Sequence, residues 1–184
     1  MIVGHWGLTY AVSAKIRNAP IVLFAVAAIA PDCLDAIYSL MGLCSAYGVY
    51  SHSLPVALPL ALVAAAFVWL ITRNRAFAFV AMALVLSHLP LDWVTGRKAL
   101  MLHGPLVGAE LYRRPLADFF TELPLLVGGW WVARRAQLVP RWAIAIPTVL
   151  ILAMTQAVGD SMNYLNLKKP ASSQNAACRA TWPL

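Results

Sequence analysis

The chain has 184 residues, of which 61% are hydrophobic and only 11% are charged. A soluble domain carries about 25% charged residues, because its surface must be hydrated. This composition excludes a soluble globular domain, an intrinsically disordered chain, a disulfide-rich secreted module and a coiled coil, and it indicates one compact membrane domain. The net charge of +7 comes without a basic helix or a zinc-finger pattern. We therefore expect no nucleic-acid partner and relate the basic residues to membrane topology.

The first forty residues allow two arrangements. Residues 4–16 form a semi-apolar helix candidate, a turn signal follows around Pro20, and residues 20–40 begin as an apolar stretch. One arrangement is a single span over residues 20–40, and the other is a helical hairpin that returns through them. We prefer the hairpin, with Lys15 and Arg17 at its tip reaching the far interface. Because these two residues interrupt the first apolar stretch, we expect no cleavable signal peptide.

Four later stretches approach the roughly 20 apolar residues that a spanning helix needs. Each is bounded by charged residues or by Pro and Gly, and they cover Leu54–Thr72, Ala76–Thr95, Leu116–Ala133 and Trp142–Val158. The sequence thus predicts an all-α integral membrane protein, a helical bundle of four to five transmembrane segments with an N-terminal helical hairpin. We expect a single domain over residues 1–166 and a polar C-terminal tail over residues 167–184.

Short basic loops indicate the orientation. The connections around residues 73–75 and 134–141 are short and rich in arginine, and such loops remain in the cytoplasm. Segments 31–53, 96–115 and 159–184 would then face outward, although the second of these is itself basic.

The three cysteines, Cys33, Cys44 and Cys178, form no CxxC pair, which argues against a structural zinc site or a redox motif. Cys33 and Cys44 would form a disulfide if their segment faced an oxidising compartment, and two free thiols are the alternative.

Ionisable side chains inside membrane spans are costly and indicate function. In the predicted topology, six potential metal ligands fall at the outer ends of the segments, and we expect them to approach a common point: His5, Asp32, Asp35, His52, His88 and Asp92. The last two are four residues apart, which places them on one helix face about 5–6 Å apart. The alternative for this pair is a hydrogen bond between them.

The other candidates have simpler explanations when each is taken alone. Asp32 and Asp35 would suit the N-cap and the first turn of a helix, and His52 lies between two serines that would cap one. His103 lies beside Gly104-Pro105, which indicates a turn residue. Three more acids would pair with nearby arginines or with each other: Glu110, Asp118 and Glu122.

The order of these motifs resembles a family of bacterial inner-membrane metal-dependent hydrolases, LexA-regulated in one branch. The resemblance covers about residues 1–105 and rests on His5, Pro31-Asp32-Cys33-Leu34-Asp35, Ser51-His52-Ser53, and His88 to Asp92 followed by Thr95 and Gly96. The family is distantly similar to zinc-dependent phospholipase C and to P1-type nucleases, which implies phosphoester chemistry. Tyr47-Gly48 stands where the family has His-Arg, and this departure puts a second metal ligand or a phosphate-binding arginine in doubt.

We therefore expect a metal-dependent hydrolase of the bacterial inner membrane, acting on an amphiphilic, phosphate-containing substrate at the outer face. Imidazole and carboxylate ligands suit zinc, with manganese or iron as alternatives. The expected ligands are His5, Asp35, His52, His88 and Asp92. Asp32 is the expected catalytic base or a further ligand. Four basic residues are expected to bind a substrate anion or lipid head groups: Arg97, Lys98, Arg113 and Arg114.

Two other functions fit the same sequence. The chain would be a non-catalytic accessory subunit of a larger membrane complex if the metal site were degenerate or structural. It would be a small transporter or a proton relay if acids lined both membrane faces, but the predicted topology places them at one face. The expected partners are membrane lipids and, for an accessory subunit, other membrane proteins.

Overall fold

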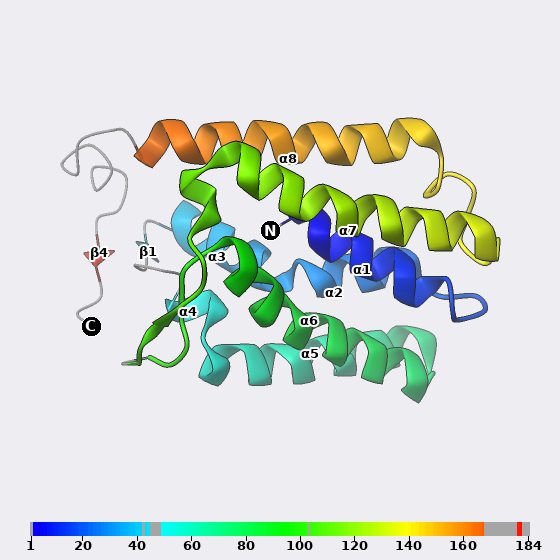
Figure 1. Cartoon of the computed structure of the whole chain (residues 1–184). Helices are drawn as coiled ribbons and strands as arrows, with labels where there is room; N and C mark the ends of the chain where they lie inside the picture. The colour runs from blue at the N-terminus through cyan, green and yellow to red at the C-terminus, as the bar shows by residue number, and fades with distance from the viewer. Residues whose placement is uncertain (1, 42, 45–48, 103, 168–179, 182–184) are drawn as a thin grey trace.

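The computed structural model describes residues 2–41, 43–44, 49–102, 104–167 and 180–181, and it is almost entirely helical (Figure 1). Its α-helices are α1 (Ile2–Ser13), α2 (Ile21–Ala28), α3 (Ala30–Leu40), α4 (Val49–His52), α5 (Leu54–Thr72), α6 (Arg75–Thr95), α7 (Pro115–Ala136) and α8 (Ile146–Leu167). A 3₁₀ turn, η2 (Leu111–Arg113), precedes α7. Four two-residue strands pair as β1 (Leu43–Cys44) parallel to β4 (Ala180–Thr181) and β2 (Lys98–Ala99) antiparallel to β3 (Leu106–Val107).

The predicted all-helical membrane fold is confirmed. Among the described residues, α5 and α6 are long and apolar enough to cross a membrane, and α2 with α3 makes a third crossing if the bent pair counts as one span. The predicted span over residues 116–133 lies within α7, which is helical but carries buried acids. The last predicted span starts too early, because α8 begins only at Ile146. The ring of Pro147 would clash with the carbonyl group four residues before it, so the helix cannot extend further back.

The N-terminal hairpin is also confirmed. Helix α1 leads into a turn in which Asn18 adopts a left-handed φ of 57°, and α2 returns alongside α1 (Figure 1). The returning arm is not straight, because α2 and α3 meet at a bend of 54°. Pro31, the second residue of α3, explains this bend, since it cannot donate a backbone hydrogen bond and its ring crowds the preceding turn.

Three basic connections lie at one end of the bundle: α1 to α2, α5 to α6, and α7 to α8 (Figure 1). The opposite end carries α3, α4 and the short strands. Three arginines at the basic end lie over tryptophan rings, with guanidinium-to-centroid distances of 5.4 Å (Arg73–Trp69), 5.2 Å (Arg134–Trp130) and 4.6 Å (Arg135–Trp131). Paired tryptophan and arginine are typical of a membrane interface.

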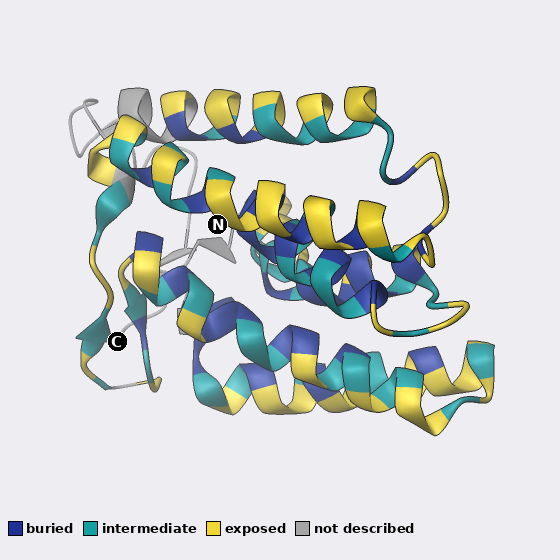
Figure 2. Ribbon diagram, turned by 45° about the vertical axis from the view of Figure 1, so that its right-hand side comes forward, coloured by how far each residue is buried: buried dark blue, intermediate teal, exposed yellow. Residues whose placement is uncertain are grey.

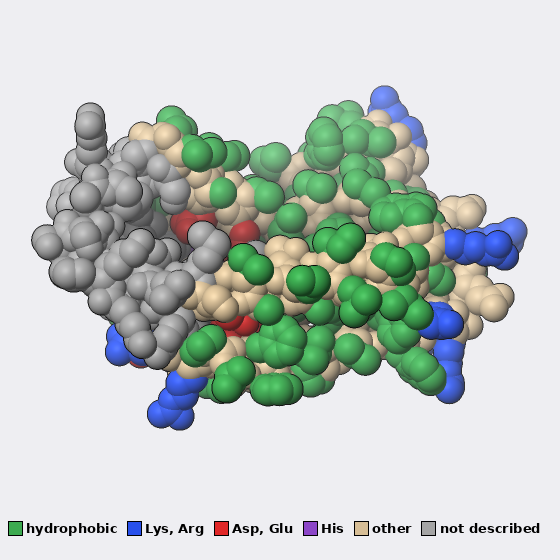
Figure 3. Space-filling model, turned by 90° about the horizontal axis from the view of Figure 1, so that it is seen from above, with side chains coloured by type: hydrophobic (Ala, Val, Ile, Leu, Met, Phe, Trp, Pro, Cys, Tyr) green, Lys and Arg blue, Asp and Glu red, His purple; other side chains and the backbone are tan. Residues whose placement is uncertain are grey.

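The flanks between the two ends are apolar. Exposed residues run along the outward sides of the helices (Figure 2), and on α5 and α8 they include Leu62, Val63, Phe67, Ile151 and Met154. In the space-filling view, hydrophobic side chains cover the middle of the molecule and most Lys and Arg side chains lie at the ends (Figure 3). This distribution suits a bilayer as the surrounding solvent.

Cysteine labelling would test the predicted orientation. In a variant without native cysteines, Asn74→Cys at the basic end should react with a membrane-impermeant maleimide only after the cells are opened. Leu102→Cys, exposed at the opposite end, should react in intact cells, because the positive-inside rule places the short arginine loops in the cytoplasm. Labelling of position 74 in intact cells would reverse the orientation.

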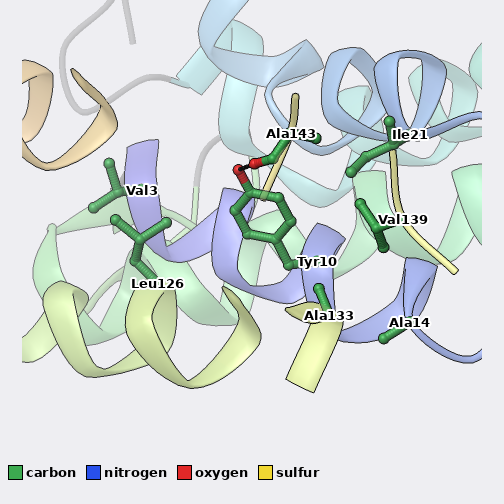
Figure 4. Close-up of a cluster of buried hydrophobic side chains, with 8 residues drawn as sticks. All are labelled: Val3, Tyr10, Ala14, Ile21, Leu126, Ala133, Val139 and Ala143. Carbon is green, nitrogen blue, oxygen red and sulfur yellow. Dashed lines mark hydrogen bonds between the residues drawn. The ribbon is translucent and has the colours of Figure 1, made fainter. Parts of the chain in front are cut away.

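Helix α1 is held against α7 at a glycine crossing. A Cβ atom on Gly7 would overlap the carbonyl oxygen of Leu125, and one on Gly129 would overlap the carbonyl oxygen of Gly7. Further along α1, the Tyr10 hydroxyl donates to the carbonyl oxygen of Ala143 at 2.6 Å within the buried cluster of Figure 4. These contacts determine where the first turn of α1 lies.

Some sequence expectations fall outside the described residues. These are the turn assignment of His103, the departure at Tyr47-Gly48 and the tail residues 168–179 and 182–184. The Cys33 thiol is exposed and free, so the Cys33–Cys44 disulfide is not formed in this structure.

Candidate metal centre

Four side chains from three helices meet at the end of the bundle opposite the basic loops. Asp32 comes from α3, His52 ends α4, and His88 and Asp92 lie on α6. One candidate ligand atom from each lies within 4.8 Å of all the others. Helix α6 continues through Pro90, so His88 and Asp92 remain on one face, as their spacing predicts.

Five of the distances within this group lie close to one another. His52 Nε2 lies 3.2 Å from Asp32 Oδ1, 3.2 Å from Asp92 Oδ2 and 3.2 Å from His88 Nε2. His88 Nε2 lies 3.5 Å from Asp32 Oδ1 and 3.6 Å from Asp92 Oδ2. A zinc ion with ligands at about 2.0–2.1 Å separates neighbouring ligand atoms by about 3.3–3.4 Å in a tetrahedral site. The five distances therefore bracket the spacing that one zinc ion imposes.

The hydrogen bonds behind the two imidazoles determine which nitrogen carries the proton. His88 Nδ1 donates to the carbonyl oxygen of Ala28 at 2.8 Å, which leaves a lone pair on Nε2 in the neutral ring. The Ser51 hydroxyl donates to Asp35 Oδ1 at 2.9 Å and lies 2.7 Å from His52 Nδ1. Since the hydroxyl has one proton, it accepts from Nδ1, and His52 Nε2 also presents a lone pair.

With both rings neutral, two nitrogen lone pairs thus face each other across 3.2 Å beside two carboxylate oxygens. Four electron-rich atoms at this separation repel one another unless a proton or a metal cation lies between them. Metal-binding histidines commonly donate their second N–H to a carbonyl or to a polar side chain, which orients the ring. The donor set of two imidazoles and two carboxylates is one that zinc accepts.

Two further residues expected as ligands lie around this group. His5, from α1, lies 3.3 Å from Asp92 Oδ1, the oxygen that does not face the other histidines, and stacks on the His88 ring at 3.8 Å. Asp35 reaches the group through Ser51, to which His52 is also bonded. His5 is therefore placed to orient Asp92, and Asp35, through Ser51, is placed to orient His52. The contribution of Ser51 was not anticipated, because a serine before a helix is more often only a cap.

The four basic residues expected to bind an anion have different surroundings, and Lys98 is the one placed beside the histidine group. Lys98, on β2, places its Nζ 3.4 Å from Asp92 Oδ2 and so lies at the edge of the group. Arg113 is bonded to Glu110 at 2.9 Å, a pairing the sequence had suggested for Glu110. Arg97 and Arg114 are exposed.

A second buried polar cluster lies between α7 and α8. Asp118, Glu122 and Asp160 offer ligand atoms within 4.8 Å of one another, and Gln156 is bonded to two of them. Of the two arrangements expected for Asp118 and Glu122, the structure shows them near each other, and no ion pair joins either one to a basic side chain within the described ranges. The i, i+4 spacing of Gln156 and Asp160 in an apolar stretch was the signal that would have revealed their role.

The two clusters are joined through the start of α1. The backbone N–H of Gly4 donates to Glu122 Oε2 at 3.3 Å, and the next residue, His5, contacts Asp92. The glycine crossing that places α1 against α7 therefore also positions both clusters.

Comparison with protein families gives a match over residues 2–164 to the model of the YdjM inner membrane protein. No curated protein and no solved structure matches the chain.

Proposed function

Since the chain belongs to the YdjM inner membrane protein family, we propose that it works in that membrane as a metal-dependent hydrolase. The proposed substrate is amphiphilic and contains a phosphate ester, and it reaches the site at the outer face. The proposed metal is zinc, with manganese or iron as alternatives. Its ligands would be His52, His88 and Asp92, which leaves the fourth position, beside Asp32, for the attacking water.

One observation carries this proposal: four buried or half-buried side chains converge at distances that suit one zinc ion, and the Nδ1 contacts of both histidines leave Nε2 available as a ligand in the neutral rings. The two carboxylates would balance the charge of a dication. Lys98 offsets part of the charge of Asp92, but the described contacts join its ammonium group to Asp92 Oδ2 and to neither of the two facing nitrogens. His5 and Asp35 have supporting roles in this proposal, as the residues that orient Asp92 and His52.

Asp32 is the proposed base. Its side chain is 29% exposed, whereas those of His52, His88 and Asp92 are 0–2% exposed, so the group opens toward solvent on the Asp32 side. Asp32 Oδ2 is itself buried and has no hydrogen-bond partner among the described residues, so in this proposal it accepts the proton of a water held at the metal. Metal ions in such sites lower the pKa of water and polarise the scissile ester. Lys98, at the rim, would hold the phosphate anion, with Arg97 beside it in sequence.

Asp32→Asn tests this assignment. The variant keeps the size and one oxygen of the side chain but removes the base, so the rate of phosphoester hydrolysis should fall about 10²–10⁴-fold. The purified protein would be loaded with zinc in detergent and assayed on p-nitrophenyl phosphate esters and on phospholipid micelles. Glu110→Gln, which removes a carboxylate paired with Arg113 instead, should leave the rate unchanged.

The same experiment separates the hydrolase from the accessory subunit. A wild-type protein that holds one zinc per chain but hydrolyses neither substrate would contradict the hydrolase and leave a structural metal centre. Equal rates for Asp32→Asn and Glu110→Gln would remove Asp32 from the chemistry.

A further inference from the structure

The buried cluster between α7 and α8 plays no part in the proposed hydrolase. Asp118 and Glu122 are one turn apart on α7, and Gln156 and Asp160 are one turn apart on α8. Each of the four is at most 4% exposed. The two i, i+4 pairs therefore face each other across the helix pair, away from lipid and water.

The hydrogen bonds in this cluster orient its side chains but do not satisfy all of its carboxylate oxygens. Gln156 Nε2 donates to Glu122 Oε1 at 2.8 Å and to Asp160 Oδ1 at 2.6 Å, which uses both of its protons. Gln156 Oε1 accepts from the backbone N–H of Val3 at 3.4 Å, and Glu122 Oε2 accepts from that of Gly4 at 3.3 Å. The α1 N-terminus also contributes a partial positive charge.

Two carboxylate oxygens receive no hydrogen bond from a donor. Asp118 Oδ1 and Asp160 Oδ2 are buried and unsatisfied within the described part of the chain, and the two carboxyl groups contact each other instead. They come from different helices and belong to the three acids whose ligand atoms lie within 4.8 Å. No described Lys, Arg or His side chain forms an ion pair with any of these acids. A buried carboxylate in this situation needs a proton or a cation.

We infer that Asp118, Glu122 and Asp160 bind a second cation, a hard divalent ion such as Mg²⁺ or Mn²⁺. All ligand atoms here are oxygens, and carboxylate oxygens suit Mg²⁺, Mn²⁺ or Ca²⁺, whereas the histidines of the first site suit zinc. Opposite ligand oxygens lie about 4.0–4.2 Å apart around Mg²⁺ and up to about 5 Å apart around Ca²⁺. The three acids, whose ligand atoms lie within 4.8 Å of one another, would therefore close by a few tenths of an ångström around the smaller ion.

The cation would join three helices. Asp118 and Glu122 belong to α7, Asp160 belongs to α8, and α1 contacts both through Gly4 and Val3. Binding at this point stabilises the folded protein in proportion to the logarithm of ion concentration. The role of this cation is therefore to hold α1, α7 and α8 together. It would be a different ion from the zinc proposed for the neighbouring histidine site.

Manganese titration tests the inference. Zinc-loaded protein in detergent would be titrated with Mn²⁺ while free Mn²⁺ is followed by electron paramagnetic resonance. We expect about one Mn²⁺ per chain in addition to the retained zinc, displaced by excess Mg²⁺. Asp160→Asn, which has nearly the same shape, should weaken Mn²⁺ binding at least tenfold and leave the zinc content unchanged. Glu110→Gln is the control, since its carboxylate pairs with Arg113, and it should bind Mn²⁺ as the wild type does.

Two results would overturn the inference. One is a wild-type protein that takes up no Mn²⁺ beyond any that replaces zinc. The other is an Asp160→Asn protein that binds Mn²⁺ as tightly as the wild type does. If infrared spectra also showed protonated carboxyl groups that disappear in the variant, the cluster would be balanced by protons instead. Helical circular dichroism would establish that the variant is folded, and Asp118→Asn provides a second variant at the same cluster.

Discussion

Replacing His88 by alanine is expected to remove most of the bound zinc from the purified protein. The Nε2 atom of His88 faces His52, Asp32 and Asp92 at 3.2–3.6 Å, and no other described side chain occupies its corner of the tetrahedron. A site that loses one of its two imidazole ligands should lose more than the 10- to 100-fold in affinity that follows loss of a supporting residue. Zinc content, measured by elemental analysis after dialysis, should fall from about one ion per chain to a small fraction.

Two variants provide the comparison for His88→Ala. Ser51→Ala removes the hydroxyl that orients His52 and should weaken zinc binding by about 10- to 100-fold. His103→Ala changes the histidine beside Gly104-Pro105 in the sequence and should leave zinc binding unchanged. If His88→Ala and His103→Ala retained equal amounts of zinc, His88 and Asp92 would only be bonded to each other. The accessory-subunit function would then be favoured.

The second large effect is expected at Gly129. A Cβ atom there would overlap the backbone of Gly7 on α1, so Gly129→Ala must push α1 away from α7. Overpacking of this kind costs about 1–3 kcal/mol, and helix association in membranes depends on such close contacts between small residues. With about 2–4 °C for each kcal/mol in a protein of this size, the thermal midpoint should fall by about 5 °C.

Gly128 provides a matched control for Gly129. It is the neighbouring residue of α7, but nothing lies within 4 Å of a Cβ built there. Gly128→Ala should therefore leave the midpoint unchanged or raise it, because alanine favours the helix by about 1 kcal/mol over glycine. Equal midpoints for the two variants would show that α1 and α7 do not approach closely at Gly129. Gly129→Ala should also lower zinc affinity, since α1 carries His5.

Several elements of the fold were readable from composition and order along the chain. A helix satisfies its own backbone hydrogen bonds in lipid, so an apolar stretch such as Leu54–Thr72 predicts its structure without knowledge of its neighbours. The confirmed helix α5 has these same limits. Proline is equally local in its effect, and Pro147 explains why α8 begins later than hydropathy suggests.

The candidate site was readable only in part. His88 and Asp92 share a helix face by spacing alone. Their approach to His52 and Asp32 could be suggested only from the shared end of several segments. Nothing in the sequence reveals that Ser51 determines the tautomer of His52, or that His5 contacts the outer oxygen of Asp92. Such contacts depend on differences of about 1 Å in how helices pack.

The sequence by itself determined that this protein is a helical membrane protein with its histidines and several acids gathered toward one end, because hydropathy and helical period act over a few turns of chain. Only the tertiary structure decided that Glu122 meets Gln156, 34 residues away, and that α1 lies between the two polar clusters. The physical reason is that long-range pairing depends on how closely backbones can approach. Here that approach depends on Gly7 and Gly129, at which a Cβ atom on either helix would collide with the other.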